Sequence, residues 1–292
     1  IITKTVSSDS GIVNIENTSI TASNYGINNI SGIVNIKNTS ITSNNYVINN
    51  KSGIVNITGT SNITSKWGNG ICNESAGTIN IGEKDGNVSI ETPIIAGYYG
   101  YGIYNDNILN FYDGIIKGKQ EAIHGKVTDI ETNYEIITKT ENEIESKYLS
   151  QLPVAKIVST NKEYLTLQAA FDESESGDTI QMLRNVTKIS TSQSITISEE
   201  KNAILDLNGY TMNSGTEKTF INNGTLEIVD SSEEKQGSLI GSGITLIENN
   251  NNLTIEETKL STLLTSPQVI DNKGTATINN STITAVTTTN GT

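Results

Sequence analysis

The sequence predicts an all-β protein, a right-handed parallel β-helix solenoid built as two modules. Three features predict this fold: a corner pattern that recurs along the chain, a period of 21 residues near its start, and strands of β-branched residues in a chain with only 3 prolines. The corner pattern is Ile, any residue, then Asn, and a new apolar strand follows within a few residues. It occurs at Ile27-Asn28-Asn29, Ile48-Asn49-Asn50, Ile71-Cys72-Asn73, Ile103-Tyr104-Asn105, Ile221-Asn222-Asn223, Ile247-Glu248-Asn249 and Ile270-Asp271-Asn272.

The first coils are near copies of one another. Gly11, Gly32 and Gly53 each open a GIVNI segment, and each lies 21 residues from the next. This length suits one turn of a three-stranded coil with short corners. The distance between Asn73 and Asn105 then grows to 32 residues, and we expect the added residues, Gly82 to Asn87 and those around Pro93, to form corner loops.

Within each coil, apolar and polar residues alternate as they do in a half-buried strand. Val13 and Ile15 are expected to point inward and Asn14 outward. The same inward pattern returns at Val34/Ile36, Val55/Ile57, Ile79/Ile81, Leu226/Ile228, Leu253/Ile255 and Ala276/Ile278, with Glu227, Thr254 and Thr277 facing solvent.

The recurring asparagines are expected to lie at the corner after a strand, because Asn tolerates a left-handed φ better than other non-glycine residues. Stacked at one corner, their amides can hydrogen-bond from coil to coil. The sequence predicts one such ladder at Asn29, Asn50, Asn73 and Asn105 and a second at Asn223, Asn249 and Asn272. The alternative is that asparagine is merely abundant in this chain.

The pattern divides the chain into three parts: residues 1–125 as the coils of a first module, 126–163 as a closing segment and connector, and 164–292 as a second module. The connector carries many charges, lacks the corner pattern and contains Pro153. Residues 165–174 form the best helical stretch, with Leu167, Ala170 and Phe171 on one face. We expect this helix to cap the first coil of the second module and shield its sheet edge.

Composition excludes several classes of function. The chain of 292 residues is only 34% hydrophobic and 5% aromatic, which favours an elongated β structure over one compact core. Its net charge of -13 disfavours binding to nucleic acid or to an anionic membrane. Cys72 is the only cysteine, and the sequence shows no apolar run of transmembrane length and no signal peptide. Because the first residue is Ile1, we expect the chain to be a piece of a longer protein.

Two segments carry a resemblance to a known family. EYLTLQAAFDESESGDTIQMLRNVT, followed by ITISEEKNAILDLNGYTMN, resembles the opening of right-handed parallel β-helix regions in surface proteins of Gram-positive bacteria, within the pectate-lyase-like superfamily. The similarity continues through INNGTLEIVDSS and DNKGTATINNSTIT and covers most of residues 155–292. The resemblance implies a secreted or cell-wall-displayed, adhesin-like protein without an identified ligand.

Residues suited to catalysis are few. In the superfamily that the chain resembles, enzymes that cleave acidic polysaccharides use a basic residue as proton acceptor together with calcium held by acidic residues, or paired carboxylates for hydrolysis. The chain has one arginine, Arg184, expected either to hold the last turn of the cap or to be solvated, and one histidine, His124, expected in a turn. The paired carboxylates Glu199-Glu200, Glu233-Glu234 and Glu256-Glu257 are expected at corners or on the outer face. We therefore expect no catalytic residue, no metal site and no cofactor.

Aromatic residues gather around the expanded coil, at Trp67, Tyr98, Tyr99, Tyr101, Tyr104, Phe111 and Tyr112. If exposed, the first five would form a stacking surface for sugars or a partner protein. The alternative is that the rings fill the wider coils of the first module. Repeated threonine, as in NTSITS, could also suggest ice binding, but its spacing is too irregular for a lattice match.

Together these patterns predict a non-enzymatic structural or adhesive module of an extracellular or cell-surface fibre protein. It would act as a stiff spacer, stack head-to-tail with copies of itself or with neighbouring modules, and bind a host glycan or surface protein. The competing expectation is a β-helix protein that binds or processes polysaccharide.

Overall fold

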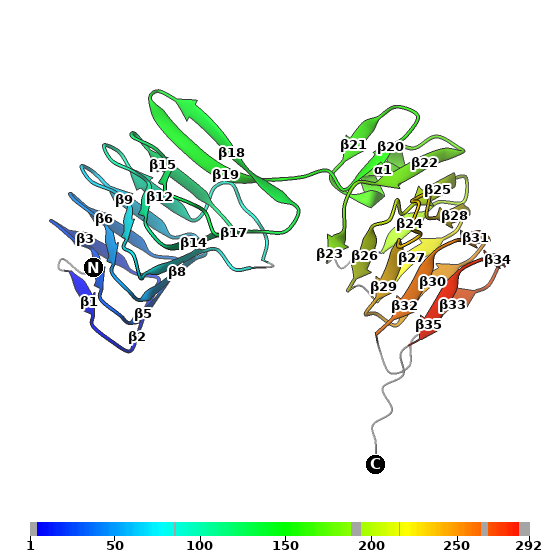
Figure 1. The fold of residues 1–292 in the computed structure, drawn as a ribbon, viewed down its shortest axis with the longest axis horizontal. Coiled ribbons are helices and arrows are strands. Elements are labelled where there is room, and N and C mark those ends of the chain that lie inside the picture. Colours follow the sequence, from blue (N-terminus) through cyan, green and yellow to red (C-terminus); the bar gives the residue numbers. More distant parts are fainter. Residues whose placement is uncertain (1–4, 85, 188–193, 216, 264–267, 286–292) are drawn as a thin grey trace, which may run out of the picture. The chain divides into compact units, whose positions relative to one another are not determined.

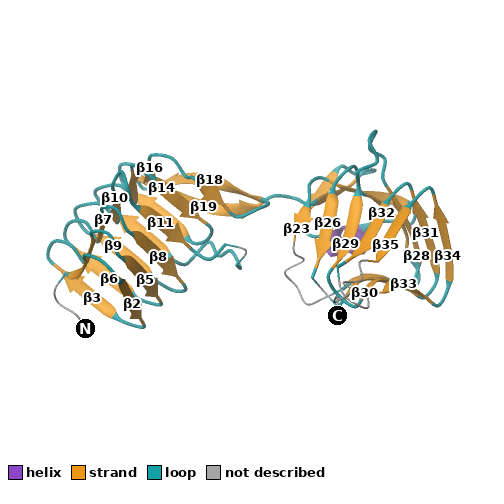
Figure 2. Cartoon of the chain, turned by 60° about the horizontal axis from the view of Figure 1, so that its bottom comes forward, coloured by secondary structure: helices purple, strands orange, loops and turns teal. Residues whose placement is uncertain are grey.

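The computed structural model describes all residues except 1–4, 85, 188–193, 216, 264–267 and 286–292. The chain forms two compact units, Ile1–Gln151 and Leu152–Thr292 (Figure 1). Each is a stack of coils whose successive turns add parallel strands to three sheets, which confirms the all-β, parallel β-helix prediction. Figure 2 shows these strands running side by side along each unit.

The first unit has three sheets, named here by their first strand. The β1 sheet contains β1 (Val6–Ser8), β4 (Ile27–Asn29), β7 (Ile48–Asn50), β10 (Ile71–Asn73), β13 (Ile103–Asn105) and β16 (Ile123–His124). The β2 sheet contains β2 (Ile12–Glu16), β5 (Ile33–Lys37), β8 (Ile54–Thr58), β11 (Thr78–Ile81), β14 (Ile108–Phe111) and β17 (Asp129–Ile130). The β3 sheet contains β3 (Ser19–Ala22), β6 (Ser40–Ser43), β9 (Asn62–Ser65), β12 (Ile94–Gly97) and β15 (Ile115–Gly118), followed by β19 (Ile144–Gln151) and β18 (Tyr134–Glu141).

Like residues stack on like residues in these sheets. Ile27, Ile48, Ile71 and Ile103 lie opposite one another, and all four are fully buried. Each such side chain contributes roughly 1.5–3 kcal/mol when buried. A narrow column of isoleucine therefore replaces the thick core of a globular domain.

A hairpin closes the end of the first unit. Strands β18 and β19 pair with each other, and β19 pairs antiparallel with β15, where the next parallel strand would lie. Leu149 of β19 is buried in the apolar core of the unit. The first part of the expected connector, residues 126–151, thus belongs to the first unit, and the unit boundary follows Gln151.

The second unit repeats the three-sheet architecture. Its first sheet contains β21 (Lys162–Tyr164), β20 (Ala155–Ile157), β22 (Asp178–Met182), β25 (Asn202–Asp206), β28 (Thr225–Val229), β31 (Asn252–Glu256) and β34 (Thr275–Asn279). Its second contains β23 (Val186–Thr187), β26 (Thr211–Ser214), β29 (Ser238–Gly241), β32 (Lys259–Thr262) and β35 (Thr282–Ala285). Its third contains β24 (Ile195–Ile197), β27 (Lys218–Asn222), β30 (Thr245–Asn249) and β33 (Gln268–Asn272).

The capping helix α1 (Leu167–Glu173) follows β20 and β21 at the beginning of the second unit. The hydroxyl of Thr166 accepts a hydrogen bond from the backbone N–H of Ala169, which caps the helix N-terminus. Leu167, Ala170 and Phe171 are buried, on the face that the sequence predicts. Gln168 joins the helix to β24 through the backbone of Thr196, so the helix lies against the first coil.

The inward pattern holds along the strands, with a difference at the last described coil. Leu253 and Ile255 are buried, and Ala276 and Ile278 lie opposite them in register. Ile278 is nevertheless 44% exposed, because no described strand lies beyond β34 to cover it.

The left-handed corners are not where the sequence analysis put them. The predicted ladder asparagines end their strands without a positive φ. Left-handed residues occur instead at the corner between the β2 and β3 sheets, at Asn17, Asn38 and Gly59, and at the matching corner of the second unit, at Glu257 and Asn280. The ladder asparagines are selected by their buried hydrogen bonds and not by backbone conformation.

Candidate functional site

A ladder of buried side-chain amides runs along the first unit, formed by the last residues of successive strands of the β1 sheet. The Nδ2 of Asn29 donates to the Oδ1 of Asn50 at 2.8 Å, Asn50 to Asn73 at 2.8 Å, and Asn73 to Asn105 at 2.7 Å. Asn29 also accepts from the backbone N–H of Gly32 and donates to its carbonyl oxygen, which fixes the turn into the next strand. The four predicted members therefore do form one ladder, inside the coil.

The second ladder contains Asn222 where Asn223 was predicted. Asn222 donates to Asn249 at 2.8 Å, and Asn249 donates to Asn272 at 2.7 Å. Phe220 lies opposite Ile247, so the aligned corner is Phe220-Ile221-Asn222 and the Ile-x-Asn pattern is displaced by one residue. Asn223 points outward and accepts from the Nδ2 of Asn250.

A third ladder, which the sequence analysis missed, lies on the outer face of the β2 sheet. The outward asparagines of successive strands donate to one another at 2.7–2.8 Å, each to the residue of the preceding coil: Asn35 to Asn14, Asn56 to Asn35, Asn80 to Asn56 and Asn110 to Asn80. A groove of about 310 Å³ borders it, lined by Glu16, Lys37, Thr58 and Glu83 together with Asn35 and Asn56. The repeated Asn in GIVNI was the available signal.

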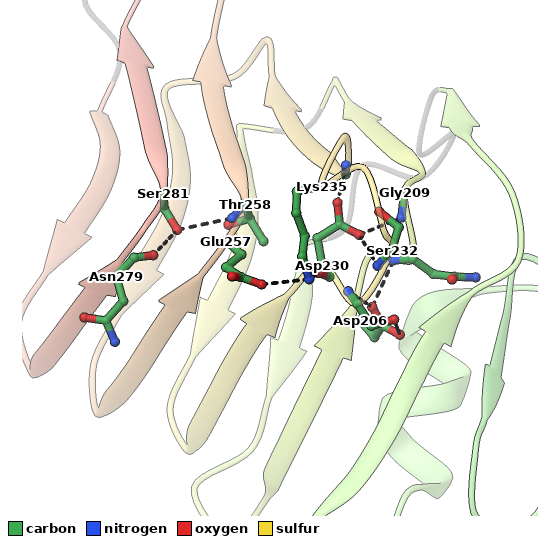
Figure 3. Close-up of polar contacts among 12 residues, drawn as sticks. Asp206, Gly209, Asp230, Ser232, Lys235, Glu257, Thr258, Asn279 and Ser281 are labelled. Atoms are coloured by element: carbon green, nitrogen blue, oxygen red, sulfur yellow. Dashed lines mark hydrogen bonds and ion pairs between the residues drawn. The ribbon is translucent and has the colours of Figure 1, made fainter.

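Hydroxyl groups link the coils at the left-handed corner. The backbone N–H of Thr39 donates to the Oγ of Ser61 at 3.2 Å, and in the second unit Thr258 donates in the same way to Ser281 at 3.2 Å (Figure 3). Each hydroxyl follows the left-handed residue of its corner. The repeated Asn-Thr-Ser carried this signal in the sequence.

Two buried carboxylates organise the corners of the second unit, as Figure 3 shows. Asp230 accepts from the backbone N–H groups of Gly209, Ser232 and Gly237. Burial acts to raise the pKa of Asp230, but the Ser232 side chain together with these backbone hydrogen bonds outweighs it and holds the pKa below its usual value. Asp206 accepts from the backbone N–H and the hydroxyl of Ser231 and from the side-chain amide of Gln181. Both carboxylates are satisfied by the protein itself, which marks them as structural.

Arg184, His124 and Glu257, for which we expected no catalytic role, each contact another residue of the protein. Arg184 donates from Nε to the carbonyl oxygen of Pro153 at 2.7 Å, which joins the segment between β22 and β23 to the residues just before β20. The Nδ1 of His124 lies 3.0 Å from the Oε2 of Glu121. Of the paired carboxylates, Glu257 forms an ion pair with Lys235 at 2.7 Å (Figure 3), and Glu199 and Glu233 are exposed. No three His, Cys, Asp or Glu residues in the described ranges are grouped as a metal site would require.

Cys72 lies in the outward row of the β1 sheet, next to Tyr104. Burial, with smaller contributions from Glu74 and Asp106, raises the pKa of the thiol to about 11. The thiol therefore stays protonated at neutral pH and is a poor nucleophile.

The aromatic residues divide by exposure. Phe111 and Tyr112 are buried, as the alternative interpretation expected. Tyr101 and Tyr104 are half-buried and pack with His124, whose ring stacks on Tyr104 at 5.0 Å. Trp67, Tyr98 and Tyr99 are 56%, 51% and 52% exposed. Neither interpretation therefore holds for the whole group, and only these three rings remain open.

The open rings belong to a surface that we name the aromatic corner. It consists of the first two residues of each corner between the β3 and β1 sheets: Ser23, Asn24, Asn44, Asn45, Lys66, Trp67, Tyr98, Tyr99, Lys119 and Gln120. The rings of Trp67 and Tyr99 stack at 4.7 Å. The Nζ of Lys66 lies 5.1 Å from the Trp67 ring, and that of Lys119 lies 5.6 Å from the Tyr99 ring. Three successive coils are thus joined by ring and cation contacts.

No family model matches the chain, and no curated protein or solved structure matches it either. Helix α1 spans seven residues, and no described helix has the length and apolar character needed to cross a membrane.

Proposed function

We propose that the chain is a non-enzymatic structural module of an extracellular or cell-surface protein, a stiff spacer that presents the aromatic corner to a partner. The observation that carries the proposal is that every corner of the first unit has its own polar or aromatic link between coils. Asn50 links coils at one corner, Thr39 at the second, and Trp67 with Tyr99 at the third. Links at all three corners resist bending and twisting of the stack.

The spacer role also draws support from the repeat itself. Coils 11–31 and 32–52 are interchangeable in register, since Ile12, Ile33 and Ile54 lie opposite one another. Each added coil lengthens the stack by about 4.8 Å, so length can change without redesign of the fold. The extracellular location, and an adhesin-like origin among surface proteins of Gram-positive bacteria, rest on the resemblance of residues 155–292.

The test is to lengthen the spacer. Ten further copies of residues 32–52, inserted after Ser52, should extend the first unit by about 48 Å in electron micrographs and leave its circular dichroism spectrum β-rich. Aggregation or unfolding of the lengthened chain would reject the spacer role. Release of new reducing ends or unsaturated sugars from a panel of polysaccharides would reject the non-enzymatic assignment and favour the polysaccharide-processing alternative.

A further inference from the structure

We propose that the aromatic corner binds a linear glycan that carries one carboxylate per disaccharide, an alternating uronate. This inference rests on the proposed role of the corner as a binding surface, and it is independent of the spacer role of the coils. Four properties of the surface support it: construction, shape, hydrogen-bonding groups and charge.

The aromatic part of the corner is a local addition to a regular repeat. The corners before β4 and β7 have four residues, whereas those before β10 and β13 have five. Trp67 and Tyr99 hold the same place in the two longer corners, and both are exposed. The loops are tightly held, because a Cβ on Gly68 would lie 2.7 Å from the Oδ1 of Asn45 and one on Gly100 would lie 2.5 Å from that of Asn69. The two rings are also held by stacking on each other and by contacts with Lys66 and Lys119, and such preorganisation lowers the entropy cost of binding.

The shape of the surface suits a chain molecule. Trp67 lies beside Asn45 in the neighbouring coil, as its backbone hydrogen bond to Asn44 shows. Equivalent residues follow one per coil, at steps of about 4.8 Å, through Asn24, Asn45, Trp67, Tyr99 and Gln120. The result is a narrow strip along the coil axis, which fits a linear polymer better than a compact ligand.

The chemical groups along the strip suit sugars. The Nδ2 of Asn45 donates to the Oδ1 of Asn24 at 3.0 Å, and the Nδ2 of Asn24 and the amide of the exposed Gln120 can serve sugar hydroxyls. Although the Trp67 and Tyr99 rings stack on each other, about half of each remains open. Those ring atoms can contact the apolar C–H groups of a sugar ring. Alternation of planar amides with aromatic rings thus matches the mixed polar and apolar surface of a glycan.

Charge selects the kind of glycan. The chain has a net charge of -13, yet the ten residues of the aromatic corner include no carboxylate and two lysines, Lys66 and Lys119. These lysines hold equivalent places two coils apart, a separation of about 10 Å, on the order of the length of two linked sugar rings. Glu143 pairs with Lys119 at 3.0 Å but is 79% exposed, so it competes weakly for the ammonium group.

The experiment titrates the full chain with short hyaluronate oligosaccharides by isothermal calorimetry at low salt. We expect Trp67→Ala and the double change Lys66→Gln/Lys119→Gln each to weaken binding about tenfold, equivalent to 1.4 kcal/mol. Trp67→Phe, which keeps a ring, should restore most of the affinity. Lys51→Gln, an exposed lysine at another corner, is the matched control and should change nothing. Glu143→Gln should tighten binding by freeing Lys119.

Several results would overturn the proposal. Equal affinity for neutral dextran, or for polygalacturonate with a carboxylate on every sugar, would remove the charge-spacing argument. Binding of heparin without hyaluronate would assign the lysines to sulfate. Absence of binding, or binding unchanged by Trp67→Ala in a variant of unchanged melting temperature, would leave the rings as a link between coils only. In each of these cases the lengthened-coil experiment still decides the spacer role separately.

Discussion

Asparagine has three different physical roles in this chain, and its environment decides which. Asn50 is fully buried and bonded to the coils on both sides. Asn56 stands in a ladder on the outer face of the same unit, where water can replace a lost partner. Asn17 has a φ of 49° and serves the backbone. An abundance of one residue type therefore hides three separate requirements.

Replacing Asn50 with alanine should destabilise the first unit strongly. The change removes the Nδ2 bonds to Gly53 and Asn73 and leaves the Nδ2 of Asn29 without its acceptor in Asn50. Buried groups left unpaired cost about 1–3 kcal/mol each, so we expect a loss of about 3 kcal/mol. Urea denaturation measures it, with Asn56→Ala as the control at a loss below about 1 kcal/mol. Equal losses would contradict the distinction between buried and outer ladders.

Glu248 should make the second unit sensitive to acid. Hydrogen bonds from Lys218 and Asn250 lower its pKa from 4.5 to about 2, and Lys273 lies 3.4 Å away. Because the folded pKa lies below the unfolded one, this stabilisation is complete above about pH 4.5 and is lost as the pH falls toward 2.

Comparing the free energy of unfolding of the unmodified protein with that of Glu248→Gln at several pH values isolates this effect from the other carboxylates. The two proteins should differ by about 1 kcal/mol at pH 6, the scale of a solvent-screened pair. They should converge near pH 2. A difference that stays constant across the range would show that the pairing of Glu248 does not stabilise the fold.

The residues of the ladders could be read from the sequence only in part. The first ladder was predicted correctly, because its members occupy the same register position in successive strands: Asn29, Asn50, Asn73 and Asn105. Asn222 was missed because Phe220 replaces isoleucine in that coil and the pattern slipped by one residue. The exposure of Trp67 could not be predicted, because it depends on how a five-residue corner packs against a four-residue one.

At the scale of the elements, strand positions followed from alternation, and corner conformation did not. Apolar residues that recur at every second position identify the inward side of a strand, so the GIVNI segments could be predicted as strands. Which corner requires a left-handed residue depends on the backbone path between sheets, and Asn is common at every corner of this chain. The closing hairpin β18–β19 was also hidden, since its charged outer residues resemble a connector.

Asn17 allows a clean test of the left-handed corner. The backbone N–H of Asn17 donates to the carbonyl oxygen of Lys37, a bond that glycine and valine can also make, so these substitutions act through backbone conformation. Asn17→Gly should change stability little, whereas Asn17→Val should cost about 1–2 kcal/mol, because a β-branched residue tolerates a left-handed φ much less well than asparagine. Thermal unfolding of the two variants decides this. Equal stability of the valine and glycine variants would show that the corner adapts without strain.

At the scale of the whole molecule, the residues that the structure describes form two apolar cores, one in each unit. All buried residues of one core precede residue 150, and all those of the other follow residue 153. Each core has its own closing element near the boundary between the two units in the sequence. These elements are the hairpin β18–β19 for the first unit and helix α1 with β20 and β21 for the second. A solenoid unit unfolds cooperatively because each coil is stabilised by its neighbours, and separate cores give separate cooperative units.

We therefore expect two thermal transitions, each sensitive to one closing element. Leu149→Ala removes a buried side chain of the hairpin and should lower one transition, at a cost of about 2–5 kcal/mol. Phe171→Ala in α1 should lower the other, at about 3–5 kcal/mol. Glu135→Gln and Asp172→Asn, on the exposed faces of the same elements, are the controls. Differential scanning calorimetry gives the result. If either core variant lowers both transitions equally, the two cores unfold as one cooperative unit and the division into independent units is wrong.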